Sequence, residues 1–136
     1  MRLFRMAILF QMGSIAVAGC SNVNAREVKS VTLECIQECL RMENKPFDKK
    51  EYKDKESIAL FAKAVNQAGK IEGVLDYAAY FRMTFRMKNG NSSEYFLNIG
   101  YTDRPQNGLL VKLPDSEHGY SISQATSEKL KKIVYE

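Results

Sequence analysis

The sequence predicts an α+β fold, in which two helices pack on one face of a small antiparallel sheet of about four or five strands. Three observations lead to this prediction. Apolar and polar residues alternate through the middle of the chain, as they do in half-buried strands. One segment before this region and one after it carry apolar residues at helical spacing. The expected order is one strand, one helix, four strands and a closing helix (β-α-β-β-β-β-α).

The composition is that of one small globular domain. Of the 136 residues, 45% are hydrophobic and 26% are charged, which is too apolar for a disordered chain. The net charge is +4, with both signs mixed along the chain, whereas nucleic-acid-binding proteins cluster their basic residues. We therefore expect no nucleic-acid partner. One histidine and three cysteines leave little material for catalysis, so we also expect no cofactor, metal or catalytic residue.

The N-terminal segment has the character of an export signal. Arg2 and Arg5 precede the apolar stretch Met6–Ala18, which as a helix is about 20 Å long and too short to span a membrane. The segment ends in VAGC, which resembles the lipobox of bacterial lipoproteins, with Cys20 as its last residue. The resemblance implies that residues 1–19 are a signal peptide and that Cys20 carries a lipid. A plain secretory signal or an N-terminal anchor with a chance cysteine is the alternative.

The rest of the chain divides into residues 20–26, a short lipidated tether, and residues 27–136, a single domain. Ser21–Arg26 is polar and without periodicity, as a tether is. Two acyl chains would hold the protein firmly on the membrane, so we expect it at the extracytoplasmic face of the cell membrane. Loss of Arg2 and Arg5 with the signal peptide lowers the net charge from +4 to +2.

Val31, Leu33 and Cys35 alternate with polar residues and predict the first strand, although the apolar spacing from Val28 to Cys39 also fits a helix. If the strand continued, Cys35 and Cys39 would lie about 13 Å apart, too far for a disulfide. On a helix the two would share a face. The preferred interpretation is two reduced thiols packed at the core, followed by a disulfide and, last, a redox role.

Residues 43–56 are dense in charges of both signs and are expected to form a solvated loop, with Phe47 or Tyr52 packed back onto the core. Asp54 or Ser57 can cap a helix that runs to about Ala68. Gly69 follows where a left-handed C-terminal cap is favoured. The apolar stripe of this helix consists of Ile58, Phe61, Ala62, Val65 and Ala68.

The alternating region contains four strands. Residues 81–87 and 95–101 alternate in the same way on either side of Asn89-Gly90, a typical tight-turn pair, and predict a hairpin. Residues 109–113 and 120–122 follow as two shorter strands. Ser123 can cap a closing helix, whose inward residues are Leu130, Ile133 and Val134.

The order of these elements and several of their residues resemble the YhfM-like domain of small lipoproteins of spore-forming Gram-positive bacteria. The resemblance covers about Val28 to Val134. It implies the fold and the location, and it implies no activity. The residues that carry it are mostly core and turn positions: Ile58, Phe61, Gly73, Asp76, Tyr80, Tyr95, Leu97, Tyr120 to Ser123, and Leu130.

The second face of the sheet is the candidate binding surface. If Phe81, Met83 and Phe85 face the helices, their polar neighbours face away, and the next two strands add Phe96, Asn98, Leu110 and Lys112. A mixture of aromatic rings and arginine is typical of protein interfaces. A solvated sheet face with scattered apolar residues is the simpler interpretation. The expected binding residues are Tyr80, Arg82, Arg86, Phe96 and Lys112.

We therefore expect a non-catalytic binding module whose partner is an extracytoplasmic protein, a peptide or a wall polymer, with the membrane bound through the lipid on Cys20. One alternative is an inhibitor or chaperone of an exported protease, because a helix followed by a hairpin sheet also occurs in PepSY-type modules. Another is a thiol-dependent enzyme that uses Cys35 or Cys39 with His118. A zinc site formed by the same three residues and an Asp115-His118-Ser121 triad are less favoured.

Overall fold

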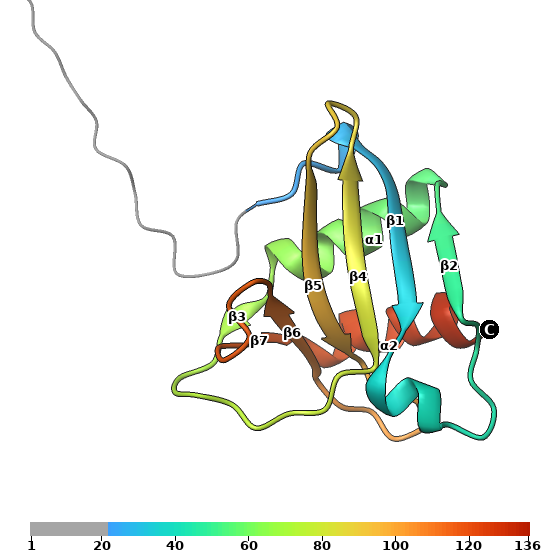
Figure 1. The fold of residues 1–136 in the computed structure, drawn as a ribbon, viewed down its shortest axis with the longest axis vertical. Coiled ribbons are helices and arrows are strands. Elements are labelled where there is room, and N and C mark those ends of the chain that lie inside the picture. The colour runs from blue at the N-terminus through green and yellow to red at the C-terminus, as the bar shows by residue number, and fades with distance from the viewer. Residues whose placement is uncertain (1–21) are drawn as a thin grey trace, which may run out of the picture.

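The computed structural model describes residues 22–136 and contains a seven-stranded antiparallel sheet with both helices on one face (Figure 1). The strands lie in the order β2-β1-β4-β5-β6-β7-β3. Their bounds are β1 Val28–Cys35, β2 Lys49–Tyr52, β3 Gly69–Lys70, β4 Phe81–Met87, β5 Ser92–Asn98, β6 Gly108–Lys112 and β7 Tyr120–Ile122. The helices are α1 Lys55–Asn66 and α2 Gln124–Tyr135, with short 3-10 turns at Ala25–Glu27 and Gln37–Arg41. The predicted signal peptide and Cys20 lie outside the described residues.

The α+β class and the antiparallel sheet are confirmed, but the predicted count of four or five strands is too low. The segment expected to be a charged loop contains β2, which pairs with β1 through its backbone and buries only Tyr52. The other additional strand, β3, has two exposed residues paired with β7. Both strands pair through their backbones but bury almost no side chains, so their sequences show no apolar alternation that would predict a strand.

The two helices begin where the sequence predicts. The Asp54 carboxylate accepts a hydrogen bond from the Ser57 amide at 3.0 Å and caps α1, and the Ser123 hydroxyl accepts one from the Thr126 amide at 3.3 Å and caps α2. The predicted left-handed cap at Gly69 is wrong, because α1 ends at Asn66 and Gly69 pairs in β3 instead. No helix within residues 22–136 is long and apolar enough to cross a membrane.

One hydrophobic cluster runs from Val23 to Val134 and fills the space between the sheet and the helices. Its largest fully buried side chains include Phe61 of α1, Leu130 of α2 and, from the sheet, Phe81, Phe85 and Tyr95. Both helices and the long central strands contribute to the cluster. Residues 23–134 therefore contain the packed elements that a small domain needs to fold by itself.

The preferred interpretation of the two domain cysteines as free thiols is wrong. Cys35 and Cys39 form a disulfide, with their Cα atoms 5.3 Å apart. The strand ends at Cys35, and the 3-10 turn that follows folds the chain back within reach of it. The predicted separation of about 13 Å between Cys35 and Cys39 holds only for a strand that continues past Cys35. Gln37 makes this reversal with a φ of 42°.

The described part of the expected tether packs against the domain. Val23 is 8% exposed and belongs to the hydrophobic cluster. Its backbone amide donates to the Asn66 side-chain oxygen at 2.6 Å, and its carbonyl accepts from the same amide group at 2.8 Å. The chain is therefore held to the end of α1 from Val23 onward.

Candidate functional site

The outer face of the sheet is built mainly by β4 and β5. In β4 the side chains of Phe81, Met83 and Phe85 are buried against the helices, while Arg82 and Arg86 are exposed on the other side. This alternation confirms the predicted orientation of the strand. Thr84 lies half-buried between the two arginines. Four residues of strand separate the arginines by about 13 Å.

Phe96 of β5 lies directly opposite Arg82 of β4 in the sheet register. The guanidinium carbon of Arg82 is 5.9 Å from the centre of the Phe96 ring, within the range of a cation–π contact. Neither Arg82 nor Arg86 forms an ion pair with a described residue. Both cations therefore keep their donors available on this face.

Lys112 does not lie on the same face as Phe96, contrary to the prediction. In the β5–β6 register Phe96 pairs with Val111, whereas Lys112 pairs with Tyr95, whose side chain points toward the helices. Directly paired residues of an antiparallel sheet share a face. Leu110 is likewise on the inner face and fully buried. In contrast to the prediction, the outer face therefore contains Val111 and does not contain Lys112 or Leu110.

The loop between β3 and β4 covers the outer face beside Phe96. Its backbone amides at Ile71 and Leu75 donate to carbonyls of the β6–β7 turn at 2.9 and 3.0 Å. The Tyr77 ring lies 6.4 Å from that of Phe96. Val111 is completely buried although it faces outward. Tyr77 is absent from the predicted binding residues, because the irregular segment that carries it has no pattern that indicates packing on the sheet.

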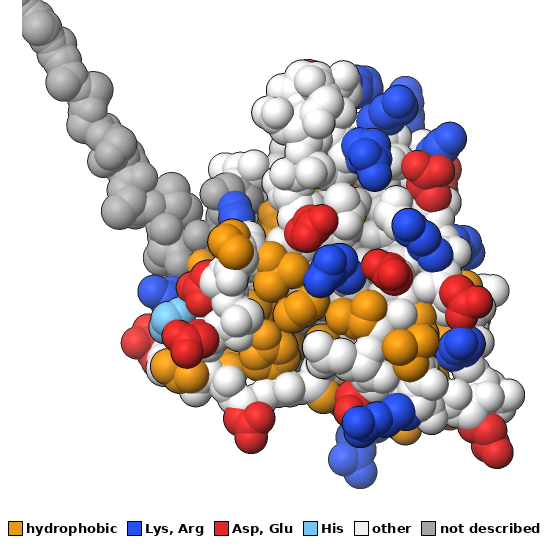
Figure 2. All heavy atoms as spheres, in the orientation of Figure 1, with side chains coloured by type: hydrophobic (Ala, Val, Ile, Leu, Met, Phe, Trp, Pro, Cys, Tyr) orange, Lys and Arg blue, Asp and Glu red, His pale blue; other side chains and the backbone are white. Residues whose placement is uncertain are grey.

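Tyr80 is partly buried against the hydrophobic cluster, next to a second aromatic side chain. It directly precedes β4, and its ring is 5.9 Å from that of Tyr101. Burial, with smaller effects from Tyr101 and Glu38, raises the pKa of Tyr80. Figure 2 shows hydrophobic side chains gathered over the lower part of the outer face, while Lys and Arg gather toward its upper end. We call Arg82, Arg86 and Phe96 the outer-face cluster, and the predicted fourth member, Tyr80, packs against the hydrophobic core.

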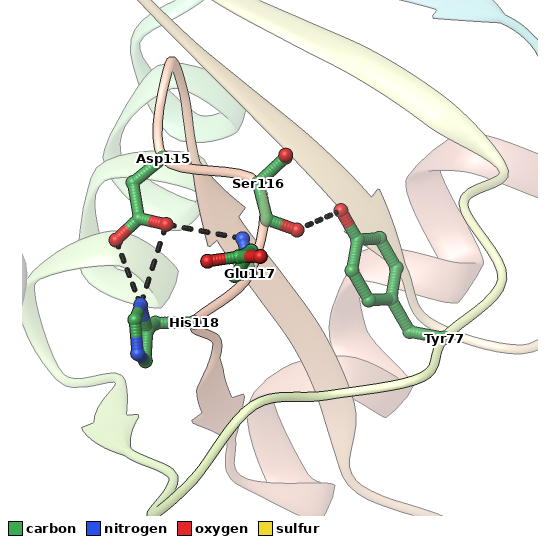
Figure 3. Close-up of polar contacts among 5 residues, drawn as sticks. All are labelled: Tyr77, Asp115, Ser116, Glu117 and His118. Carbon is green, nitrogen blue, oxygen red and sulfur yellow. Dashed lines mark hydrogen bonds and ion pairs between the residues drawn. The ribbon is translucent and has the colours of Figure 1, made fainter.

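The side chains of His118 and Asp115 are hydrogen-bonded to each other in the β6–β7 turn (Figure 3). The Nδ1 atom of His118 is 3.0 Å from Asp115 Oδ2. A hydrogen bond from the Glu117 amide and, next, the one from His118 lower the pKa of Asp115. On the loop side, Tyr77 donates through its hydroxyl to the Ser116 carbonyl at 2.7 Å.

This turn lacks the arrangement that a nucleophilic triad needs. The predicted third member, Ser121, lies in β7 and pairs with Leu109 and Gly69 through the sheet. The cavity beside His118 measures about 170 Å³, and no serine, threonine or cysteine is among the described residues that line it. Ligand pockets are usually larger, about 300–1,000 Å³. The Asp115–His118 pair serves to shape the turn.

The cysteine-based alternatives meet a chemical obstacle in this structure. The sulfurs of Cys35 and Cys39 are bonded to each other, and both residues are at least nine-tenths buried. A thiol-dependent reaction needs a thiolate, and a zinc site needs deprotonated cysteine ligands. Within residues 22–136, no group of three or more His, Cys, Asp or Glu side chains is placed to hold a metal ion.

A family model described as YhfM protein matches residues 33–136 of the chain. The chain belongs to this family. The YhfM match confirms the resemblance predicted for the domain and spans the chain from within β1 to its last residue. It names no activity and does not reach Cys20. No curated protein and no solved structure matches the chain.

Proposed function

We propose that this YhfM-family chain is a lipoprotein anchored through Cys20 at the extracytoplasmic face of the membrane, where its domain acts by binding. The anchoring is supported by the basic start, the short apolar stretch and the VAGC motif of residues 1–20. The Cys35–Cys39 disulfide supports export, because disulfides persist in oxidising compartments and are rare in the cytosol.

The observation that carries the binding role is the pair of exposed arginines on β4 beside a half-buried aromatic ring. Arg82 and Arg86 have no ion-pair partner among the described residues, and Phe96 places an apolar surface next to them. Arginine and aromatic side chains dominate the binding energy of many protein interfaces. Because they stand on paired strands, their backbone is already ordered before a partner binds.

A protein or an extended peptide fits this face better than a uniformly anionic wall polymer. The outer face also carries Glu34, opposite Arg82 in β1, and Glu94, opposite Thr84 in β5. A polymer of like negative charges would meet these carboxylates along with the arginines. A polypeptide can present both signs in register with them.

The binding proposal is tested by crosslinking on intact cells. A photoreactive amino acid in place of Thr84, between the two arginines, is expected to capture a discrete partner, whereas the same amino acid in place of Lys129 on α2 is not. Arg82→Ala with Arg86→Ala should abolish this product, and Lys129→Ala with Lys132→Ala should leave it unchanged. Equal crosslinking from Thr84 and Lys129, or a product that survives the arginine changes, would assign binding to another surface.

The anchoring proposal is tested separately by Cys20→Ser. The variant has no thiol for lipid attachment, so it is expected to stay uncut or to leave the membrane fraction. Cleavage and membrane retention identical to the unchanged chain would argue for a plain N-terminal anchor. Cell fractionation with immunoblotting measures both properties.

A further inference from the structure

A basic groove lies at the end of the sheet where β1 begins and β2 and β4 end, next to the first turns of α1. It encloses about 640 Å³, within the usual range for a ligand site. Five cationic side chains line it: Arg26, Lys29, Lys53, Lys55 and Lys88. Between them lie the apolar side chains of Val28 and Ile58, which are 4% and 6% exposed.

The charges of this groove are not balanced from within. No aspartate or glutamate is among the described residues that line it. Lys53 has one distant ion pair, to Glu51 at 3.7 Å, and the other four cations have none with a described residue. The Ser57 amide in the first turn of α1 is already capped by Asp54, so we expect the lysines and the arginine to hold an anionic ligand. Figure 2 shows blue side chains gathered at this upper end of the molecule.

The groove is also close to the proposed lipid attachment site in the chain. Ala25 lines the groove and is five residues after Cys20, so the two can be at most about 18 Å apart. Val23 is fixed to α1, which limits its own separation from Cys20 to about 11 Å. A lipid on Cys20 would therefore keep this end of the domain near the membrane surface.

We propose that the basic groove docks the domain onto anionic phospholipid headgroups, with the cations on the phosphates and the nearly buried Val28 and Ile58 forming the apolar floor of the groove. The orientation rests on the proposed anchoring at Cys20, whereas the headgroup binding does not. A docked groove would hold the domain in one orientation, whereas lipidation alone would leave it to tumble on its tether.

The test uses residues 21–136 without any lipid, because this part contains the packed core, and measures co-sedimentation with vesicles. We expect binding to vesicles of phosphatidylglycerol and phosphatidylcholine in equal parts and none to phosphatidylcholine alone. Each cation at an anionic surface changes binding about fivefold, so Lys29→Gln, Lys53→Gln and Lys88→Gln together should weaken it by at least tenfold. Raising the salt from about 0.1 M to 1 M should also release the protein, because the screening length falls from about 10 to about 3 Å.

The matched control removes three exposed lysines elsewhere, with Lys70→Gln, Lys129→Gln and Lys132→Gln, and should change binding less than twofold. Circular dichroism checks that both triple variants are folded. Equal weakening by the two triple variants would show attraction by net charge alone and overturn the proposal, as would no binding by the unchanged chain. Equally tight binding of soluble poly(glycerol phosphate) would assign the groove to a wall polymer instead of the membrane. Because no variant here touches Cys20, Arg82 or Arg86, failure of the groove leaves the anchoring and outer-face tests independent.

Discussion

At the scale of single residues, Tyr52 and Tyr135 have similar surroundings but different hydrogen-bonding partners. Both rings pack on the core, Tyr52 against Phe61 at 5.0 Å and Tyr135 against Phe81 at 6.0 Å. The Tyr52 hydroxyl donates to the Ile133 carbonyl at 3.3 Å. The buried hydroxyl of Tyr135 has no partner among the described residues. Only the first hydroxyl therefore recovers the cost of leaving water.

Phenylalanine substitutions should separate these two cases. Tyr52→Phe is expected to lower the free energy of unfolding by about 1 kcal/mol, because it removes a satisfied hydrogen bond. Tyr135→Phe should leave the free energy of unfolding unchanged or raise it slightly. Urea unfolding at neutral pH measures both, with exposed Tyr101→Phe as the control. A larger loss from Tyr135→Phe than from Tyr52→Phe would contradict the hydrogen-bond assignment.

The same tyrosines predict the response to alkaline pH. Burial, with a smaller effect from Asp54, raises the pKa of Tyr52 from 10.0 to about 12, and burial also raises the pKa of Tyr135. A raised pKa means that the folded state holds its proton more tightly than the unfolded state. The stability contributed is complete below pH 10 and is lost as the pH rises toward 12. The double Phe variant should therefore lose less stability than the unchanged chain over this interval, as measured by urea midpoints.

At the scale of elements, the strands that were predicted correctly are those with one buried face. The alternation of Phe81, Met83 and Phe85 specifies both the strand and the side that meets the helices. In β6 the apolar residues Leu109, Leu110 and Val111 are consecutive, so alternation alone leaves two possible orientations. In the fold Val111 pairs with the outward-facing Phe96, on which Tyr77 packs, and such long-range packing leaves no local signal.

The contact between α2 and β6 depends on a glycine. A Cβ atom at Gly108 would lie 2.6 Å from the Ser127 hydroxyl of α2 and 3.3 Å from Ile122 and Ile99. Gly108→Ala is therefore expected to cost about 1–3 kcal/mol through overpacking. Gly69→Ala in β3 is the matched control, since a Cβ there has open space, and should stay within about 0.5 kcal/mol. Thermal and urea unfolding measure both, and equal effects would contradict the close packing.

At the scale of the whole molecule, one core joins the sheet to both helices, so the short disulfide is an addition to an already packed domain. The candidate surface follows from the same arrangement: both helices cover one face, which leaves Arg82 and Arg86 exposed on the other. The sequence predicted this for β4, where the alternation is regular. It did not predict the basic groove, whose five cations come from three separate segments that only the folded chain brings together.

Removal of the disulfide should therefore weaken the domain without unfolding it. Cys35→Ala with Cys39→Ala opens a loop of about five residues and is expected to cost about 2 kcal/mol. The variant should still unfold in one transition, and a reductant should shift the unchanged chain by the same amount while leaving the variant unaffected. Circular dichroism during urea unfolding measures the shift. A variant without a cooperative transition would show that the disulfide is required for folding.

The two edge strands of the sheet determine whether neighbouring copies of the protein can pair their sheets. An open strand edge can pair with the same edge of a neighbouring molecule, which is a route to aggregation. Here one edge strand, β2, carries the adjacent lysines Lys49 and Lys50, and the other, β3, is only two residues long. Charge at one edge and shortness at the other both discourage such pairing. Copies anchored on one membrane surface, as proposed, would collide often, and these edge strands would keep their sheets from pairing.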